Sequence, residues 1–197
     1  EIIALNTDKQ HLDMISADKK ILIGKELTRG LGCGGFPEKG REAARESMHE
    51  IRTGMKDVDM VFITAGMGGG TGTGSAPIVA QLARESGSIV IGTVTMPFDI
   101  ERARVDKAEF GLQQLREVCD TVIVIENNLP VQQAFAVANE LVSTMIKGIV
   151  EIIAVPSLVN LDYADVRAIM AQGDVSVIGI GEANSESRVE EAVRRAL

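Results

Sequence analysis

The hydrophobic positions of the chain form short apolar runs that alternate with longer segments of helical spacing. The runs that predict strands are residues 2–5, 21–23, 58–65, 88–95 and 121–125. Apolar runs of this length, bounded by turn residues, are typical of strands that are covered on both faces. The segments that predict amphipathic helices are residues 38–52, 76–86 and 101–118. This alternation predicts an α/β fold of Rossmann-like type, a parallel sheet with helices on both faces.

The later part of the chain has a different pattern. Residues 130–153 are mostly apolar and predict one helix, buried between two layers and longer than the mean of ~11–12 residues. Residues 162–171 predict a helix that starts with clustered acids, residues 175–180 a strand and residues 185–197 an amphipathic helix. So few elements cannot bury a core alone, and we expect them to be the start of a second α/β domain.

The composition narrows the class of protein. Apolar residues make up 45% of the 197 residues but aromatic residues only 3%, so the core must be aliphatic. The net charge of −8 argues against a nucleic-acid partner, because phosphate backbones are bound by clustered lysine and arginine. The spacing of Cys33 and Cys119 suits neither a metal site nor a disulfide framework, which favours a reducing, cytoplasmic setting. No apolar run approaches the ~20 residues that span a bilayer, and the chain starts without a signal-like pattern.

A glycine-rich segment, residues 66–74, lies between the strand 58–65 and the helix 76–86. It contains six glycines and two threonines, and we expect Ser75 to cap the helix and Pro77 to lie in its first turn. Glycine lets a backbone approach a ligand closely, and a helix start offers free N–H groups and the positive end of a dipole. The segment therefore predicts an anion site, most often for phosphate, rather than a flexible turn.

Two common phosphate-loop patterns do not account for this segment. The Walker pattern needs a lysine that no register supplies, and the dinucleotide pattern G-x-G-x-x-G fails in every register of residues 66–74. The dinucleotide pattern does match residues 30–35, but the polar residues 25–29 before it predict no strand that leads into it. We therefore expect residues 30–37 to form a second loop that faces the same phosphates.

The sequence GGGTGTG at residues 68–74, after an apolar strand, resembles the tubulin/FtsZ superfamily. The supporting stretches are ALNTD at 4–8, TRGLG at 28–32, TMPF at 95–98 and NLDYADV at 160–166. Within the superfamily the chain is most similar to FtsZ, the family of prokaryotic tubulin-like cell-division GTPases, in its archaeal form. The resemblance spans essentially the whole chain, and its glycine motif and Asn-Leu-Asp-x-Ala-Asp motif are both specific.

The resemblance implies three parts for the chain. These are a GTP-binding domain at residues 1–129, a central helix at 130–153, and a catalytic loop with an incomplete C-terminal domain at 154–197. The family normally has an earlier strand and a further glycine-rich loop, and usually several more residues between Asn128 and Leu129. We expect these to have been left out, because loss of the first strand would expose the nucleotide site.

The resemblance also implies the residues that bind GTP or GDP, with Mg²⁺ held mainly through the phosphates and water. The phosphates would be held by Gly68, Gly69, Gly70, Thr71, Gly72 and Thr73, and the γ-phosphate would be sensed by the loop with Gly32, Cys33, Gly34 and Gly35. The rest of the nucleotide site would contain Asn6, Pro97, Glu101, Arg104, Asn127, Phe135 and Asn139. Phe135 matches the aromatic residue that stacks on guanine, and Asn127 a residue near the ribose and base.

Simpler interpretations of these residues stay open. The side chain of Asn6 suits a turn at the end of its strand, Glu101 and Arg104 suit a solvated first helical turn, and Phe135 suits core packing. Cys33 suits a small filler better than a reactive thiol.

The chain also departs from the family at three positions. Phe36 stands where the family often has Asp or Asn, which removes support for a polar or Mg²⁺-linked role there. Val105 stands near where bacterial forms cluster arginines, so the register of Arg104 is loose. Asn139 stands where many FtsZ proteins have Asp, although asparagine still accepts a hydrogen bond from guanine through its carbonyl group.

The catalytic residues implied by the resemblance are Asp162 and Asp165, with Asn160 supporting the same loop. Their spacing puts the two carboxylates on one face of a helix start, where simple helix capping is the alternative. An aspartate can orient and polarise an attacking water. In the family these residues act on the nucleotide of the next subunit, so hydrolysis requires a head-to-tail filament.

These patterns leave three candidate functions. The first is a polymerisation-dependent GTPase that assembles cell-division filaments in the cytoplasm at mid-cell, with itself, division-machinery proteins and membrane tethers as partners. The second is a nucleotide-dependent oxidoreductase, which is supported only by the G-x-G-x-x-G match at residues 30–35. The third is a tubulin-like scaffold for cell shape that keeps the nucleotide site with little or no turnover.

Overall fold

The computed structural model describes residues 1–125, 139–140, 142–144, 146–151, 165, 168, 190–191 and 194. The strands are β1 (Ile3–Asn6), β2 (Lys19–Leu22), β3 (Met60–Gly66), β4 (Ile89–Thr95) and β5 (Thr121–Ile125). The helices are α1 (Lys9–Met14), α2 (Lys25–Thr28), α3 (Pro37–Glu46), α4 (Met48–Gly54), α5 (Thr71–Glu85) and α6 (Arg102–Val118), with a 3-10 turn η1 at Asp99–Glu101. The structure thus contains every strand predicted before residue 126.

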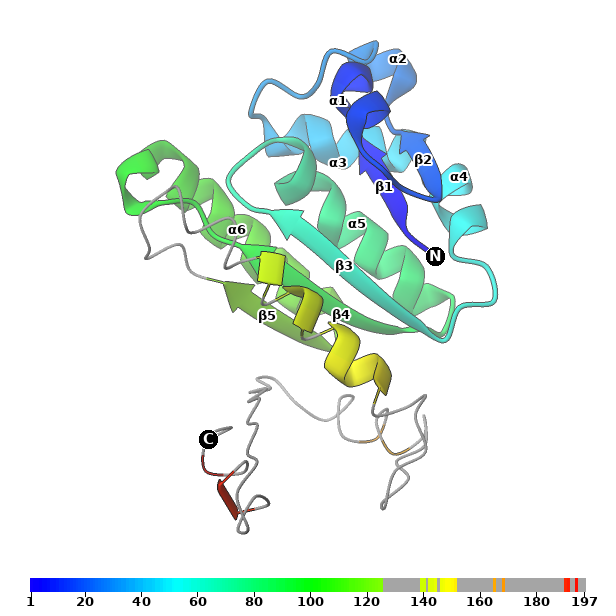
Figure 1. The fold of residues 1–197 in the computed structure, drawn as a ribbon. Coiled ribbons are helices and arrows are strands. Elements are labelled where there is room, and N and C mark those ends of the chain that lie inside the picture. Colours follow the sequence, from blue (N-terminus) through cyan, green and yellow to red (C-terminus); the bar gives the residue numbers. More distant parts are fainter. Residues whose placement is uncertain are drawn as a thin grey trace.

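The strands pair in parallel, as predicted, but in two hydrogen-bonded sheets (Figure 1). One sheet consists of β1 and β2, and the other has the order β3–β4–β5. The register of the larger sheet aligns Gly66 with Thr95 and Thr95 with Ile125, so its three strands end at one edge. Parallel neighbours need crossover connections, and α5 and α6 provide them here. The α/β fold class is confirmed.

Helical segments pack against both faces of the larger sheet. Successive strand residues point to opposite sides, so each strand contributes to both contacts. One face packs in the main core with residues of α5 and α6, and its strand residues are Val61, Ile63, Ala65, Val90, Val94, Val122 and Val124. The other face packs against Ile146 and Ile149, and its strand residues are Met60, Phe62, Ile89, Ile91 and Ile123. Figure 1 shows the helical segment near residue 149 in yellow beside this sheet.

The described part of the predicted central helix is helical but is not buried on all sides. Ile149 is 7% exposed against the sheet, whereas Val150 is 45% exposed. Polar residues at 139, 140, 143, 144 and 147 share the exposed sides, which explains why the described residues of this segment bury one face only. The predicted elements at residues 175–180 and 185–197 lie largely outside the described residues.

The helix after the glycine-rich segment begins earlier than predicted. α5 starts at Thr71, with Gly70 as its N-cap, so part of the glycine-rich segment is its first turn. Ser75 lies inside the helix, where its hydroxyl donates to the Thr71 carbonyl at 2.7 Å instead of capping. Pro77 also lies inside α5 and removes the helical hydrogen bond to the Thr73 carbonyl. The helix ends at Glu85, next to the predicted end at residue 86, and Gly87 follows with a φ of 88°, the left-handed conformation that favours glycine.

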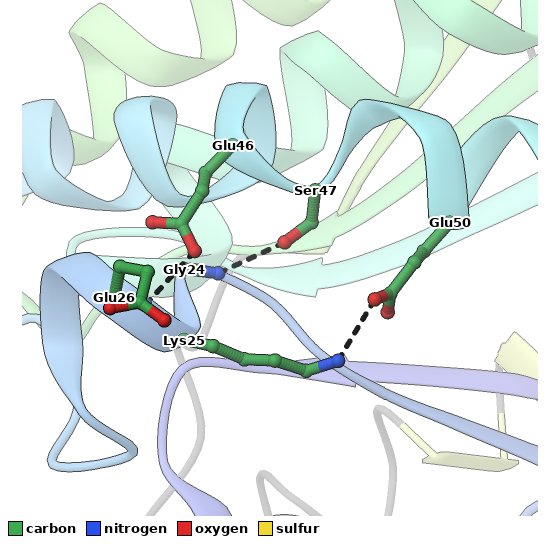
Figure 2. Close-up of polar contacts among 6 residues, drawn as sticks. All are labelled: Gly24, Lys25, Glu26, Glu46, Ser47 and Glu50. Atoms are coloured by element: carbon green, nitrogen blue, oxygen red, sulfur yellow. Dashed lines mark hydrogen bonds and ion pairs between the residues drawn. The ribbon is translucent and has the colours of Figure 1, made fainter.

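The helix predicted at 38–52 is broken at Ser47 into α3 and α4. The buried Ser47 hydroxyl accepts a hydrogen bond from the Gly24 N–H at 3.1 Å, which turns this residue toward α2 (Figure 2). The short helices α1 and α2 were not predicted, because helices of six and four residues are too brief to show a hydrophobic period.

The N-terminal turns of α3 and α5 cross at van der Waals contact, and glycines make this possible. A Cβ placed on Gly40 of α3 would overlap the Gly70 carbonyl oxygen, and one on Gly74 of α5 would overlap the Pro37 carbonyl oxygen. In contrast, a Cβ on Gly69 would meet no atom within 4 Å. The two helix starts are therefore locked together backbone to backbone, while Gly69 faces open space.

In the described part of the chain, none of the helices combines the length and apolar character that crossing a membrane requires.

We expect Gly74→Ala to lower the free energy of unfolding by about 1–3 kcal/mol, because overpacking must separate α3 from α5. Thermal melting of the intact protein measures this. Gly69→Ala is the matched control and should melt like the native protein. Equal melting temperatures for the two variants would contradict the close crossing.

We expect the Cys119 thiol to resist alkylation in the native protein. Burial, reinforced by the nearby negative charge of Asp120, raises the pKa of Cys119 to about 12. A raised thiol pKa depletes the reactive thiolate at pH 8. Mass spectrometry after iodoacetamide treatment should find Cys119 unmodified in native protein and modified after denaturation. Rapid labelling without unfolding would show that this thiol is accessible.

Candidate functional site

The candidate site lies where β1, β3 and β4 end and the N-terminus of α5 begins. The end of β3 is joined to the end of β4 by a hydrogen bond from the Met67 N–H to the Thr95 carbonyl at 2.9 Å. The end of β1 is joined to α5 by the Thr7 and Thr71 hydroxyls, which are 2.7 Å apart. Ligands of open α/β folds bind at the carboxyl ends of the strands, so this is the expected place for a site.

The N-terminus of α5 is not capped by a side chain of the described residues. Its N-cap is Gly70, and the first hydrogen bond of the helix runs from the Gly74 N–H to the Gly70 carbonyl at 3.1 Å. The N–H groups of the first turn have no partner within a helix and carry the positive end of its dipole. Because Gly69 faces open space beside them, an anion can approach these groups.

The glycine segment before α5 has a fixed shape. Gly68 has a φ of 89°, and its N–H donates to the Thr73 hydroxyl at 2.9 Å in a buried position. A Cβ on Gly72 would come within 2.5 Å of the Gly66 carbonyl oxygen. The predicted phosphate residues, 68–73, thus form one preorganised turn.

Thr7 connects three segments of the site and was missed as a site residue by the sequence analysis. Its side chain is 0% exposed. Besides Thr71, its hydroxyl accepts a hydrogen bond from the Cys33 thiol at 3.3 Å. Its carbonyl accepts from the Gly32 N–H at 3.1 Å and from the Thr28 hydroxyl at 3.1 Å. The signal for Thr7 was its place directly after an apolar strand, where polar side chains gather at a sheet edge.

The second glycine loop, residues 30–36, lies against the first. Its glycines with positive φ are Gly30, Gly32, Gly34 and Gly35. A Cβ on Gly70 would come within 2.6 Å of the Cys33 Cβ and 2.9 Å of the Phe36 nitrogen. The structure therefore brings residues 32–35 beside the glycine segment, as the sequence analysis expected, and buries Cys33 in the contact.

A carboxylate of α3 holds the helix that precedes this loop (Figure 2). The Glu46 side chain accepts hydrogen bonds from the N–H groups of Glu26 at 3.0 Å and Leu27 at 3.2 Å, at the start of α2. Lys25 forms an ion pair with Glu50 of α4 at 2.8 Å. These contacts anchor α2, and with it Thr28, to α3 and α4. Because α2 and not a strand leads into the loop, the G-x-G-x-x-G match at 30–35 lacks its dinucleotide-binding context.

Pro97 and Arg104, which the resemblance assigns to the nucleotide site, lie beside Gly68. A Cβ on Gly68 would come within 3.3 Å of the Pro97 Cγ and 2.9 Å of the Arg104 Cβ. The Glu101 carboxylate pairs with Arg104 at 2.6 Å and accepts from the Phe98 N–H at 3.2 Å. Glu101 thus fixes the loop after β4, while the Arg104 side chain is 60% exposed at its rim.

The Asn6 side chain takes part in the local turn that was its alternative interpretation. Its Oδ1 accepts from the Asp8 N–H at 3.1 Å, and its Nδ2 lies 3.1 Å from Nδ1 of His11. The remaining candidates lie farther along the chain. Asn127, Phe135, Asn160 and Asp162 are outside the described residues, whereas Asn139 and Asp165 are helical and exposed.

This arrangement is suited to holding a phosphate group through backbone N–H groups at crossed helix starts. Lysine cations stand nearby, since Lys39 and Lys107 flank the Phe36 ring at 5.4 and 5.7 Å from its centroid. Among the described residues, no three His, Cys, Asp or Glu side chains gather into a possible metal site.

Comparison with known proteins gives consistent matches. Residues 1–134 match the model of the Tubulin/FtsZ family, GTPase domain. The chain is 56% identical to cell division protein FtsZ 2 of Methanocaldococcus jannaschii, covering 100% of this chain and 55% of that protein. It is 54% identical to cell division protein FtsZ 1 of Archaeoglobus fulgidus, covering 100% of this chain and 56% of that protein. The chain thus spans about half the length of the curated relatives it matches.

Solved structures agree with this assignment. An empty FtsZ dimer of M. jannaschii matches with a TM-score of 0.88 and 50% identity, over 98% of this chain and 59% of that one. CetZ of Methanosaeta thermophila shares the fold, with a TM-score of 0.81 at 21% identity over 100% of this chain and 58% of that one. With the family model covering the strands, glycine loops and helices described above, the chain belongs to the Tubulin/FtsZ family and carries its GTPase domain fold.

Proposed function

We propose that this protein binds GTP at the N-terminus of α5, hydrolyses it to GDP and phosphate, and polymerises head-to-tail into filaments of the cell-division ring. The observation that carries the proposal is the uncapped start of α5 beside the open space at Gly69. In a member of a GTPase-domain family, this is the place that suits nucleotide phosphates. The relatives named cell division protein FtsZ supply the cellular context.

The phosphates would lie on the backbone of residues 68–73, with residues 32–35 closing over them from the second loop. Support comes from the contact between these loops at Gly70 and from the buried hydroxyl links through Thr7. Arg104, exposed beside Gly68, is placed to meet a phosphate or the ribose if its pair with Glu101 opens. The Asn6 side chain is bonded within its local turn, so the proposal does not depend on a direct contact between Asn6 and the nucleotide.

The base would be bound by Phe135, Asn127 and Asn139, as the resemblance implies. Asn139 can accept from guanine through its carbonyl group, so guanine remains the expected base. Mg²⁺ would bind between phosphate oxygens and waters and supply charge neutralisation.

Hydrolysis would use a carboxylate contributed by a second copy of the chain. Asp165, which is exposed on a helix, and Asp162 would orient the attacking water in the neighbour's site, supported by Asn160. A contact in which the loop of one subunit completes the site of the next is heterologous and builds open filaments. The protein would then act in the cytoplasm at mid-cell, with division-machinery and membrane-tether proteins as further partners.

Under this proposal, the chain would have three parts with separate roles. Residues 1–129 would form the GTP-binding domain, residues 130–153 the central helix, and residues 154–197 the catalytic loop and the start of a C-terminal domain. The packing of Ile146 and Ile149 on the sheet supports a helix that joins the nucleotide site to the C-terminal part of the chain. The alternative is a tubulin-like scaffold that binds nucleotide with little turnover. The two are distinguished by the rate of GTP hydrolysis.

We expect Asp165→Ala to lower GTP hydrolysis by the intact protein about 100-fold or more while GTP binding persists. Native activity should rise steeply above a threshold protein concentration, because the site is completed between subunits. Glu190→Ala, at another exposed helical acid, is the matched control and should keep the native rate. Activity linear in protein and indifferent to Asp165→Ala would place the whole site within one chain. No turnover by the native protein would favour the scaffold.

We expect Gly69→Ala to weaken GTP binding about tenfold or more without lowering the melting temperature. The added methyl group meets no protein atom but fills the space in which the phosphates would lie. Equilibrium titration with a fluorescent GTP analogue measures the affinity. Unchanged affinity in the folded variant would show that nucleotide does not bind against this residue.

A further inference from the structure

One face of α6 lies along the start of α5, loop 30–36 and the glycine segment at Gly68. A Cβ on Gly111 would overlap the Thr73 side chain, which sets α6 against the start of α5. One turn earlier, the Lys107 ammonium group donates to the Gly35 carbonyl oxygen at 2.8 Å, across 72 residues of sequence. Arg104, one further turn back, lies beside Gly68. These positions recur at helical spacing and form a single stripe.

The contact of Lys107 is made to the least supported part of loop 30–36. The beginning of the loop is tied to Thr7 through the Gly32 N–H and the Cys33 thiol. Toward its end, Gly34 and Gly35 have φ of 59° and 77°, and a Cβ on Gly35 would meet no atom within 4 Å. Glycine pairs of this kind cost the most conformational entropy to fix. The Phe36 N–H donates to the Cys33 carbonyl at 3.2 Å, and the Phe36 carbonyl accepts from the Gly40 N–H of α3 at 3.3 Å. Among the described residues, the side chain that donates a hydrogen bond to these two glycines is Lys107.

Phe36 adds to the same contact. The Lys107 Nζ lies 5.7 Å from the Phe36 ring centroid, within the ~6 Å range of cation–π attraction. The ring is 54% exposed and so gains little from burial. Lys39 lies 5.4 Å from the same centroid but, among the described residues, has no hydrogen bond to the loop backbone. Lys107 therefore has a hydrogen bond to the loop backbone that Lys39 lacks among the described residues.

We propose that Lys107 is a positioning residue that latches loop 30–36 onto α6, and that this latch sets the affinity for nucleotide phosphates. The second part rests on the proposed function. Lys107 acts by holding the Gly35 carbonyl oxygen toward α6, which keeps the loop closed against Gly70 with Cys33 buried beneath it. Release of this carbonyl would let the glycine backbone turn and lift the loop from the start of α5.

Cys33 provides a readout of the latch that does not depend on nucleotide. It is 4% exposed in the closed loop, and the other cysteine of this chain, Cys119, is buried apart from the site. In the intact, nucleotide-free protein, the labelling rate of Cys33 by a thiol reagent is followed on its own peptide by mass spectrometry. The variants are Lys107→Met, which keeps the apolar stem, Lys107→Gln, Lys107→Arg as the conservative rescue, and Lys39→Met as the matched control.

We expect Lys107→Met and Lys107→Gln to speed labelling of Cys33 at least about fivefold and to raise the dissociation constant for GTP about tenfold. Lys107→Arg should stay within about twofold of native in both, because its guanidinium still donates to a carbonyl and stacks on an aromatic ring. Lys39→Met should keep the labelling rate of Cys33 within about twofold of native, and it is a control for labelling only, because Lys39 lies near the proposed phosphate site. Melting temperatures verify that every variant is folded.

Three outcomes would overturn the proposal. Unchanged labelling of Cys33 in Lys107→Met and Lys107→Gln would show that the loop does not need the latch. Equal labelling rates of Cys33 in Lys39→Met and Lys107→Met would assign the contact to the Phe36 ring and general charge. Faster labelling with unchanged GTP affinity would separate the loop from phosphate binding. If the native protein binds no GTP, the proposed function fails, and the Cys33 rates alone still decide whether the latch exists.

Discussion

The close crossing of α3 and α5 is the constraint on which the rest of the site depends. Only glycine at 40 and 74 lets the two helix starts touch backbone to backbone, with Gly70 at the point of contact. Two helix N-termini thereby converge on one place, and each carries unpaired N–H groups and a positive dipole end. The chain leaves the start of α5 without a side-chain cap there, although a Ser or Thr cap would stabilise the helix by about 1 kcal/mol. An anion that binds at this position would accept the hydrogen bonds that a capping side chain otherwise accepts.

The buried threonines turn this crossing into a rigid site. Thr7 and Thr73 are at most 1% exposed, yet each has a hydrogen-bond partner in a neighbouring loop. Satisfied polar groups in a low-dielectric interior fix geometry more strongly than exposed ones do. Glu46 and Ser47 accept hydrogen bonds from the backbone of α2 and from Gly24. These bonds fix the residues that lead into loop 30–36.

The sequence predicted the parts of this site that depend on local pattern. The strands, the approximate end of α5 and the proximity of the two glycine loops were predicted from hydrophobic runs and from the pattern of glycines. The start of α5 was predicted too late, because serine is a common N-cap residue and Ser75 was assigned that role. The observed start depends on the αR conformation of Gly70 and on the packing of α3 against it. The break at Ser47 and the hydrogen bonds of Thr7 could not be predicted, because their partners lie 23 and 64 residues away in sequence. The place of Thr7 after an apolar strand marked its position but not its partners. Contacts of this range are visible only once the sheet and helices are assembled.

Because the chain is acidic, an anion site on it must depend on groups close to the anion and not on the overall charge. A net charge of −8 would repel a polyphosphate at long range, although a Debye length of ~8 Å at physiological salt confines that repulsion to the near surface. Binding must then come from groups within a few ångströms of the anion. The start of α5, the crossed start of α3, and the cations Lys39, Lys107 and Arg104 are gathered at one edge of the fold. Lys107 donates to the Gly35 carbonyl oxygen, so in the proposed site its charge would act on an anion through the loop it holds as well as through space. The positive character of the site therefore depends on backbone geometry more than on the number of basic residues, and this is why an acidic chain can present it.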